Sequence, residues 1–561
     1  MSEKDLQKEI LDLKTELRRL KKNYLGLGFE DKLEDVVTNC QENIPVLKEI
    51  KAKRILSRDQ NQNNLLIEGD NYHSLSVLNY THKEKIDLIY IDPPYNTGNK
   101  DFVYNDNYVD KEDGYRHSKW LSFMRRRLEL AKNLLKESGV IFISIDDNEQ
   151  AHLRILCDKI FGENNFVANL IWKSKSGGAN DSRFFAVDHE YILVYAKNVD
   201  KYALNLDTEA IVSTSYNLED ERGEYALDRL DKQSLGYLPS LDFPIKDPDG
   251  KIYKVWHKNS EQKVARWRWS EQTVSERYSE LVFQKGFVYT KNYKKDGAIP
   301  RSLLIDERFG RTRTGKTLLG DIFGKEVFSN PKPTKLVKYI ISLSTNKDAK
   351  VLDFMAGSGT TGQAILELNQ EDKGKREFIL CTSNELNGVG SELATQNSHQ
   401  PSQSFGICQR VTYQRLKRVI EGYKNKKNEK VAGLGGNLFY YKTDLVNIEK
   451  IHKIPDEAKI RVTYQAGEMI AVREDTLNEV EKNEWWQIFE GKGRMTTIYF
   501  KEDKSKLGEL IEKLEKKSTP VALYIFSWGK NEYKGEYSSI NIRVEDIPEP
   551  ILEVYKEINR L

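Results

Sequence analysis

Asp92-Pro93-Pro94-Tyr95 is the segment of this 561-residue chain whose residue types and spacing are best suited to chemistry. An exocyclic amine on an aromatic ring is a poor nucleophile, because its lone pair is delocalised into the ring. The carboxylate of Asp92 and the backbone carbonyl of Pro93 could accept both amine hydrogens and localise that lone pair. Pro93 and Pro94 would hold these acceptors rigid before a substrate arrives. Tyr95 adds an aromatic face on which a planar base could stack.

A second segment, Val351 to Thr360, joins an apolar run to a glycine-containing loop. Glycines without a side chain would let the backbone approach a bulky ligand closely. On its own such a loop is a weak signal. The residues predicted to bind a ligand here are Asp353, Phe354, Ala356, Gly357, Ser358 and Gly359.

The elements that must position these segments are short buried strands. Ile86 to Ile91 runs into Asp92, and Val351 to Asp353 runs into the glycine loop. Other predicted strands lie at 65–67, 139–147, 189–195 and 378–385, and a helix passes through Trp120, Met124, Leu128 and Leu135. This alternation predicts an α/β fold with a doubly wound, mostly parallel sheet, whose ligands bind at the carboxyl ends of the strands.

Taken together, the two motifs resemble the catalytic motif and the S-adenosylmethionine (SAM) loop of amino-methylating DNA methyltransferases. Their permuted order resembles the β-class adenine-N6 enzymes. Further matches at 92–106, 117–124, 144–149 and 189–193 resemble the Mod (modification) subunit of type III restriction–modification systems. The resemblance covers about 60–200 and 325–425 of the chain.

This resemblance implies SAM as cofactor and a flipped adenine, methylated on N6, as substrate. Asp70 would lie near the adenine of the cofactor, and Lys332, within Asn330 to Leu336, near its methionine end. Glu385 could accept the ribose hydroxyls, as an acidic residue does in dinucleotide folds. A polar stretch at 386–405, which looks like an insertion, would lie beside that pocket. The implied partners are double-stranded DNA, a second copy of the chain in a homodimer, and a restriction (Res) subunit.

The domain organisation expected from these patterns has five parts. It comprises a helical N-terminal segment at 1–58, the catalytic half at 59–200, a target-recognition domain at 201–328, the SAM-binding half at 329–425 and a small α+β C-terminal domain at 431–561. A short heptad stripe from Leu6 to Tyr24 favours a helix packed on its own domain over a dimer seam. The segment 423–430 is predicted to be a linker.

The region around 200–330 has the composition of a nucleic-acid-binding surface. Residues 251–330 contain 17 Lys and Arg against 9 Asp and Glu, interleaved with aromatic residues as in Arg266-Trp267-Arg268-Trp269. Basic side chains neutralise phosphates, whereas a solvated basic face around ordinary core tryptophans is the alternative interpretation.

Gly310 to Thr317 satisfies the phosphate-loop pattern G-x-x-x-x-G-K-[ST]. That loop needs a buried strand before it and a firm helix after it. Here the preceding apolar run is short and charged residues follow it, and Gly320 and Gly324 interrupt the next stretch. We therefore interpret the match as a chance one, in a solvated loop or a loop that contacts DNA phosphates. The rival hypothesis is an ATP-driven motor.

Composition limits the remaining possibilities. The chain carries 88 basic and 86 acidic residues, so a nucleic-acid partner must bind a local patch. No run of 18 apolar residues and no signal-peptide pattern is present, which predicts no membrane association. Four scattered cysteines predict neither a disulfide framework nor a metal site, and favour a cytoplasmic location.

The sequence leaves several alternative functions open. N4-cytosine methylation uses the same amine chemistry, although that group more often has Ser in place of Asp92. A solitary adenine methyltransferase without a restriction partner would have the same motifs. A non-catalytic scaffold with a degenerate fold is disfavoured by the intact Asp92, Pro93, Tyr95 and glycine loop. Methylation of a protein glutamine is disfavoured because those enzymes usually carry Asn at this position.

Overall fold

The computed structural model describes most of the chain. The described residues are 29–57, 62–99, 101–177, 184–210, 215–258, 263–384, 406–529, 532–533, 535–537, 539 and 541–559. They form two compact units, one made of Leu206–Pro300 and the other of the rest of the chain.

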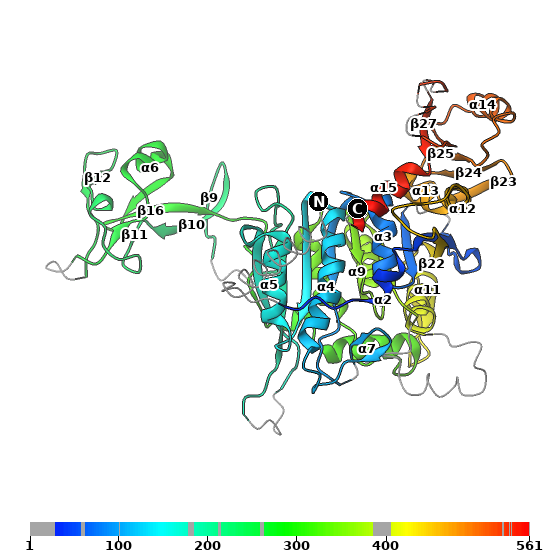
Figure 1. The fold of residues 1–561 in the computed structure, drawn as a ribbon. Coiled ribbons are helices and arrows are strands. Elements are labelled where there is room, and N and C mark those ends of the chain that lie inside the picture. The colour runs from blue at the N-terminus through cyan, green and yellow to red at the C-terminus, as the bar shows by residue number, and fades with distance from the viewer. Residues whose placement is uncertain are drawn as a thin grey trace, which may run out of the picture. The chain divides into compact units, whose positions relative to one another are not determined.

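The larger unit is built on a sheet of ten strands (Figure 1). In spatial order these are β1 (Asn43–Glu49), β22 (Asn437–Asn447), β2 (Asn63–Glu68), β19 (Glu377–Thr382), β18 (Lys350–Asp353), β3 (Ile86–Ile91), β6 (Leu135–Ile145), β8 (His189–Ala196), β7 (Phe166–Lys173) and β17 (Leu303–Leu304). The strands from β22 to β6 are parallel to one another, and β1 and β8 run antiparallel to their neighbours. The predicted doubly wound, mostly parallel sheet is confirmed.

Helices cover both faces of this sheet, because alternate strand residues point to opposite sides. Ile89 and Ile91 belong to one core, with α3 (Asn71–Thr81), α4 (Arg116–Leu134) and α5 (Gln150–Phe161). Leu88 and Tyr90 belong to the other core, with α7 (Thr312–Phe323), α8 (Thr334–Ser344), α9 (Thr360–Asp372) and α11 (Tyr413–Glu421). Buried on both faces, the central strands consist almost entirely of apolar residues, as expected for a parallel sheet.

The direction of winding reverses between β3 and β18. From β3 the chain crosses to β6 through α4 on one face, whereas from β18 it crosses to β19 through α9 on the other face. The two strands are neighbours and parallel, with Leu88 opposite Val351 and Ile89 opposite Leu352. Such a switch point opens a crevice beyond the carboxyl ends of the two strands, where ligands bind in this architecture.

The C-terminal part is an α+β layer that shares a core with the large sheet. It contains α12 (Asp456–Gln465), α13 (Gly467–Glu474), α14 (Leu507–Glu515), α15 (Glu549–Ile558) and a sheet of β23 (Asn478–Lys482), β24 (Trp486–Gly491), β25 (Arg494–Tyr499), β26 (Val521–Phe526) and β27 (Ile542–Ile547). The expected start of a separate domain at 431 differs from the structure, because β22 lies inside the large sheet. Residues 423–430, predicted to be a linker, belong to a hairpin of β20 (Gly422–Lys424) and β21 (Lys430–Ala432).

The smaller unit, Leu206–Pro300, has its own antiparallel sheet and core. Its main sheet consists of β15 (Leu281–Gln284), β16 (Phe287–Tyr293), β10 (Gly223–Arg229) and β9 (Leu218–Asp220), with α6 (Glu271–Glu276) nearby in sequence. Trp267 is buried in that core and donates to the carbonyl of Phe243 at 2.7 Å, as expected for a core tryptophan. The expected boundaries of 201 and 328 differ from the structure, because β17 and α7 pack in the larger unit.

The N-terminal segment differs from the sequence prediction. The N-terminal segment was predicted to be helical to residue 58, but Asn43–Glu49 forms strand β1, because Ile44, Val46 and Leu47 are buried against β22 and the core. The heptad stripe at 6–24 lies outside the described residues. Within the described ranges, none of the helices combines the length and the apolar character needed to cross a membrane. All four cysteines are free and buried.

Candidate active site

Asp92 follows β3 directly and is the first polar side chain at the switch point. Its carboxylate Oδ1 lies 2.9 Å from the ammonium Nζ of Lys332, and the side chain is 28% exposed. The same ammonium lies 3.1 Å from the carboxylate of Glu190, which belongs to β8. A cation therefore joins two carboxylates from different strands at one edge of the sheet.

Tyr95 takes part in the same cluster. Its hydroxyl donates to Glu190 Oε2 at 2.8 Å and accepts from Lys332 Nζ at 2.8 Å. The ammonium also lies 4.9 Å from the centre of the Tyr95 ring. With its hydroxyl held at one end, the ring has a defined orientation beside Asp92.

Burial and charge oppose one another in this cluster. Burial raises the pKa of Asp92, and the neighbouring Lys332 ammonium partly offsets that increase. Burial alone would lower the pKa of Lys332, but Asp92 and Glu190 outweigh it and raise that pKa. Burial would raise the pKa of Glu190, but Lys332 and Tyr95 lower it below its ordinary value. The arrangement therefore keeps Lys332 charged and Glu190 ionised, and the Lys332 ammonium opposes the protonation of Asp92 that burial favours.

A second polar network holds the loop that follows Tyr95. Asn96 has a left-handed backbone, with φ of 56°, and its side-chain amide donates to the buried carboxylate of Glu149. The same carboxylate bonds to Nδ1 of His117 at 2.7 Å and to Nδ1 of His152 at 2.8 Å. The side chains of His117, Glu149 and His152 are close enough to hold a metal ion, with ligand atoms within 4.8 Å of one another. Their mutual hydrogen bonds already account for the arrangement.

Trp120 supports the loop that contains Pro94 and Tyr95. Its indole nitrogen donates to the carbonyl of Pro94 at 2.7 Å, and its side chain is fully buried. His117 and Trp120 therefore contact the loop residues or their partners. His189, at the start of β8, bonds to the hydroxyl of Tyr191 at 3.1 Å.

The glycine loop follows β18, beside the Asp92 loop. Gly357 and Gly359 have φ of 47° and 79°, in the left-handed region that favours glycine. Asp353 is buried and accepts from the backbone of Met355 and from the hydroxyl of Thr361. Burial raises the pKa of Asp353 to about 7. Phe354 and Ala356 are buried beside it, in the two cores on opposite faces of the sheet.

A buried cation braces the same loop from α11. Arg415 is fully buried and donates to the carbonyl and hydroxyl oxygens of Ser358, at 3.2 and 3.0 Å. It also donates to Thr360 and to Gln363. Thr412 donates to the carbonyl of Gly357 at 2.6 Å. Thr412 and Arg415, which follow the polar stretch 386–405 in the sequence, therefore hold the glycine loop in place.

Asp70 lies just beyond the end of β2, which is separated from β18 by β19 in the sheet. Its carboxylate caps α3 by accepting from the backbone of Tyr72 at 2.6 Å, and it lies 3.5 Å from Arg127. The side chain of Asp70 is 36% exposed, so it retains acceptor capacity toward a ligand. Glu385, predicted to accept ribose hydroxyls, lies outside the described residues, as does the stretch to residue 405.

The phosphate-loop pattern has a different structural role. Residues 312–323 form helix α7, so most of the pattern is helical and the expected solvated loop is wrong. A side chain at Gly315 would meet the carbonyl oxygen of Pro331 at 2.2 Å. The glycine therefore allows α7 to pack against the segment that carries Lys332. Lys316 is exposed on this helix.

Sequence reasoning missed three residues of the site. Glu190, Asn96 and Glu149 lie within segments that carried the resemblance, but no role was predicted for any of them. The available signal was a charged or polar side chain at the end of a predicted buried strand or in the loop after it. That signal is common, and only the tertiary contacts select these three.

Residues 86–385, more than half of the chain, match the N6_N4_Mtase family, described as DNA methylase. The chain belongs to this family. It is 33% identical over 414 residues to the type III restriction–modification enzyme StyLTI Mod subunit of Salmonella typhimurium, which covers 68% of this chain and 60% of that protein. It is 35% identical over 416 residues to the type II methyltransferase M.KpnI of Klebsiella pneumoniae, which covers 71% of this chain and 95% of that protein.

The chain therefore spans about three fifths of the length of that Mod subunit. Among solved structures, PvuII DNA methyltransferase, named as cytosine-N4-specific, matches with a TM-score of 0.32 and 12% identity, covering 60% of this chain and 94% of that one. At such a TM-score the match adds nothing to the fold, which is established by the strand order above.

The methyl donor of this family is SAM, and the residues at this edge of the sheet fit it. Two glycines with left-handed backbone leave room for a close approach, and Asp70 and Asp353 present carboxylates beside it. When bound, SAM supplies an electrophilic methyl group on a sulfonium.

Proposed function

We propose that this DNA methylase transfers a methyl group to N6 of an adenine that has been flipped out of double-stranded DNA. One observation carries the proposal: Asp92 and the glycine loop follow adjacent parallel strands, so the amine acceptor and the proposed SAM loop share one crevice. Lys332 contacts Asp92 through its ammonium, and its backbone carbonyl accepts from Thr360 at the end of that loop.

In the proposed reaction, Asp92 and the carbonyl of Pro93 accept the two amino hydrogens of the adenine. The nitrogen lone pair is then directed away from the ring and toward the methyl group. Pro94 keeps the turn rigid, and Tyr95, held through its hydroxyl by Glu190, stacks on the base. As the C–N bond forms, the methyl–sulfur bond of the donor breaks and leaves a neutral thioether, and the amine then loses a proton to Asp92 or to water.

The proposed SAM contacts are the ones expected from the sequence. Asp70, Lys332 and Glu385 would contact the ends of the cofactor, and the glycine loop would contact its centre. That loop comprises Asp353, Phe354, Ala356, Gly357, Ser358 and Gly359. The support is the position of Asp70 after β2 and of the glycine loop after β18, together with the contact of Lys332, which precedes α8, with Asp92. Glu385 lies outside the described residues.

We further propose that the smaller unit, residues 206–300, reads the DNA sequence. Its independent core supports that role, as does its second half, residues 251–300, in which 11 Lys and Arg stand against 5 Asp and Glu and are interleaved with aromatic residues. The buried Trp267 is excluded from base stacking by its position in the core, whereas Trp256 is 44% exposed and available for contact.

The proposed setting is a restriction–modification system in the cytoplasm, in which two copies of the chain act with a Res subunit. The likeness to a Mod subunit supports it. A solitary methyltransferase is the second candidate, because M.KpnI is matched over 95% of its own length. Co-expression with the protein encoded beside the gene, followed by light scattering of the purified complex, distinguishes the two.

The deciding experiment is transfer of radiolabelled methyl from SAM to DNA by the purified chain. We expect transfer by the wild type, transfer at the wild-type rate by Asp348→Ala, and loss of transfer in Asp92→Ala. Asp348 is an exposed carboxylate before the amino end of β18, far along the strand from the candidate site. Full transfer by Asp92→Ala would reject the proposal.

The methylated base is identified by mass spectrometry of hydrolysed product DNA. N6-methyladenine is the expected product, and N4-methylcytosine would assign the enzyme to the other amine substrate of this family. Sequencing of methylated DNA from cells that express the chain gives the base and its context together.

A further inference from the structure

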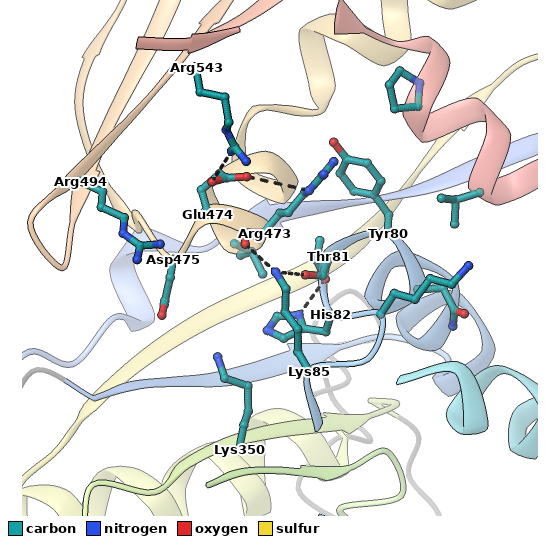
Figure 2. Close-up of a pocket in the computed structure, with 15 residues that line it drawn as sticks. Tyr80, Thr81, His82, Lys85, Lys350, Arg473, Glu474, Asp475, Arg494 and Arg543 are labelled. Atoms are coloured by element: carbon teal, nitrogen blue, oxygen red, sulfur yellow. Dashed lines mark hydrogen bonds and ion pairs between the residues drawn. The ribbon is translucent and has the colours of Figure 1, made fainter. Parts of the chain in front are cut away.

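A pocket of about 610 Å³ lies on the other side of the larger unit, at the amino ends of β3 and β18 (Figure 2). His82 and Lys85 precede β3, and Lys350 begins β18. Arg473 lies in the last turn of α13, and Arg494 begins β25. Because Asp92 and Asp353 lie at the opposite ends of the same strands, this pocket is separate from the candidate active site.

The lining of the pocket carries more positive than negative charge. Its cations are Lys83, Lys85, Lys350, Arg473, Arg494 and Arg543, and its carboxylates are Glu474 and Asp475. Both carboxylates are already engaged. Glu474 accepts from the hydroxyl of Tyr524 at 2.7 Å and pairs with Arg543 at 2.8 Å. Asp475 pairs with Lys492 at 2.6 Å.

Three polar groups that line the pocket have unmet capacity for hydrogen bonds. The ammonium of Lys85 donates to the carbonyls of Thr81 and Arg473, both at 3.0 Å, and has no carboxylate partner among the described residues. Arg494 makes no ion pair or hydrogen bond through its side chain within the part of the chain that the structure describes. The hydroxyl of Tyr80, a residue only 6% exposed, has no hydrogen bond of normal geometry among the described residues, and Arg473 is the cation next to its ring.

The crowding of cations has a measurable electrostatic consequence. Burial, together with the nearby charges of Lys350 and Lys85, lowers the pKa of His82 well below its ordinary value. Burial also lowers the pKa of Lys85, with the charges of Lys350 and Arg473 adding to that effect against the opposing charge of Glu474. An anion in the pocket would remove this repulsion. Figure 2 shows Lys85, Lys350 and Arg494 arranged around the same space.

We propose that this pocket binds a small compound with several phosphate charges. Arginine guanidinium groups and lysine ammonium groups are the side chains that bind phosphate oxygens. The volume falls within the range of about 300–1,000 Å³ that is typical of small-ligand sites. The six cations come from five segments of the chain around a hollow. Four of them already pair with carboxylates, namely Lys83, Lys350, Arg473 and Arg543. Lys85 and Arg494, which have no carboxylate partner among the described residues, supply the charge that is open to a ligand, and two such cations suit an anion with more than one charge.

The test is isothermal titration calorimetry of the full chain with sodium tripolyphosphate. We expect saturable binding at one site, weakened at least tenfold by Arg494→Ala and by Lys85→Ala. The matched control is Lys516→Ala, which removes an exposed lysine that makes no described side-chain contact in the same C-terminal part. Because Arg494 is exposed and unpaired, its replacement leaves folding intact, and a thermal melt by circular dichroism checks this.

Two results would overturn the proposal. One is the absence of saturable heat in the wild type, and the other is equal binding by Arg494→Ala and Lys516→Ala. A competition experiment distinguishes a free polyphosphate from the phosphates of a nucleic acid. Short duplex DNA should leave tripolyphosphate binding unchanged, whereas displacement by that DNA would show a nucleic-acid backbone site instead. Binding of ATP with the same dependence on Arg494 would support a free nucleotide as the natural compound.

Discussion

At the scale of single residues, the ammonium of Lys332 controls the charge of the candidate site. It joins Asp92, Glu190 and Tyr95, which come from two different strands and one loop. Sequence reasoning selected Lys332 and Asp92 for separate tasks, because residues so far apart in the chain carry no pattern of mutual contact. Glu190 was not selected, because its segment matched only as part of a strand. Contacts across the sheet, and not spacing, define this cluster.

Lys332→Met should shift the acid side of the pH–rate profile to higher pH. The lysine opposes the upward shift that burial imposes on the pKa of Asp92, and Asp92 must be ionised to accept an amine hydrogen. Without the ammonium, a higher pH is needed to ionise it. The measurement is the methylation rate from pH 5 to 9. Lys335→Met, at an exposed neighbour, should keep the wild-type profile, and an unchanged acid side in Lys332→Met would contradict the argument.

Glu149→Gln should lower kcat while leaving SAM binding unchanged. Glu149 accepts from Asn96, His117 and His152, and a neutral amide cannot accept all three bonds. The Asn96 turn, which follows Tyr95, then loses its anchor. We expect a decrease of about tenfold, equal to about 1.4 kcal/mol in the activation free energy. Calorimetry with SAM and single-turnover methylation give the two quantities, and a decrease confined to SAM affinity would argue against a positioning role.

At the scale of elements, apolar runs predicted the central strands well, because a strand buried on both faces needs apolar side chains throughout. Helix α7 was not predicted. Gly315 and Gly320 lower helix propensity, but burial of Leu319 and Ile322 outweighs that preference. Strand β1 was also missed, since its seven residues adjoin charged sequence. Prediction from local sequence preference failed for these two elements because tertiary packing outweighs that preference.

Gly315→Ala should reduce methylation strongly without unfolding the protein. The added methyl group would lie 2.2 Å from the carbonyl of Pro331, so the segment that carries Lys332 must move. A shift of about 1 Å at a positioning group can cost about 100-fold in rate. The control is Gly508→Ala, in helix α14, where a side chain meets nothing within 4 Å and should stabilise the helix by up to about 1 kcal/mol. Equal activities of the two variants would exclude this role for α7.

Asp353→Asn should make stability less dependent on pH. Burial raises the pKa of Asp353 from 3.8 to about 7, so the folded state binds a proton that the unfolded state releases between these values. Stability of the wild type therefore falls as pH rises from about 4 to 7, by up to about 4 kcal/mol from this group. The amide removes that contribution. Urea unfolding at pH 5 and pH 8 measures the difference, and an equal loss in variant and wild type would refute it.

At the scale of the whole molecule, the chain has fewer independent parts than composition suggested. The switch point, the crevice and the two sets of helices followed from strand and helix patterns. The boundaries did not, because β22 joins the large sheet and α13 and α15 share its core. Among the described residues, 206–300 separate from the rest as a compact unit. We therefore expect the C-terminal layer to support the fold of the catalytic sheet.

Tyr555→Ala tests that coupling. Tyr555, in α15, is 1% exposed, packs in the common core and donates to the carbonyl of Pro45 in β1. Removing a buried aromatic side chain typically costs about 3–5 kcal/mol. Because the core is shared, SAM binding and the C-terminal structure of the variant should be lost together, at one urea midpoint that is lower than that of the wild type. Tyr555→Phe keeps the ring and should cost only about 1 kcal/mol. If SAM binding instead survived at the wild-type midpoint while the C-terminal layer unfolded, the two parts would be independent.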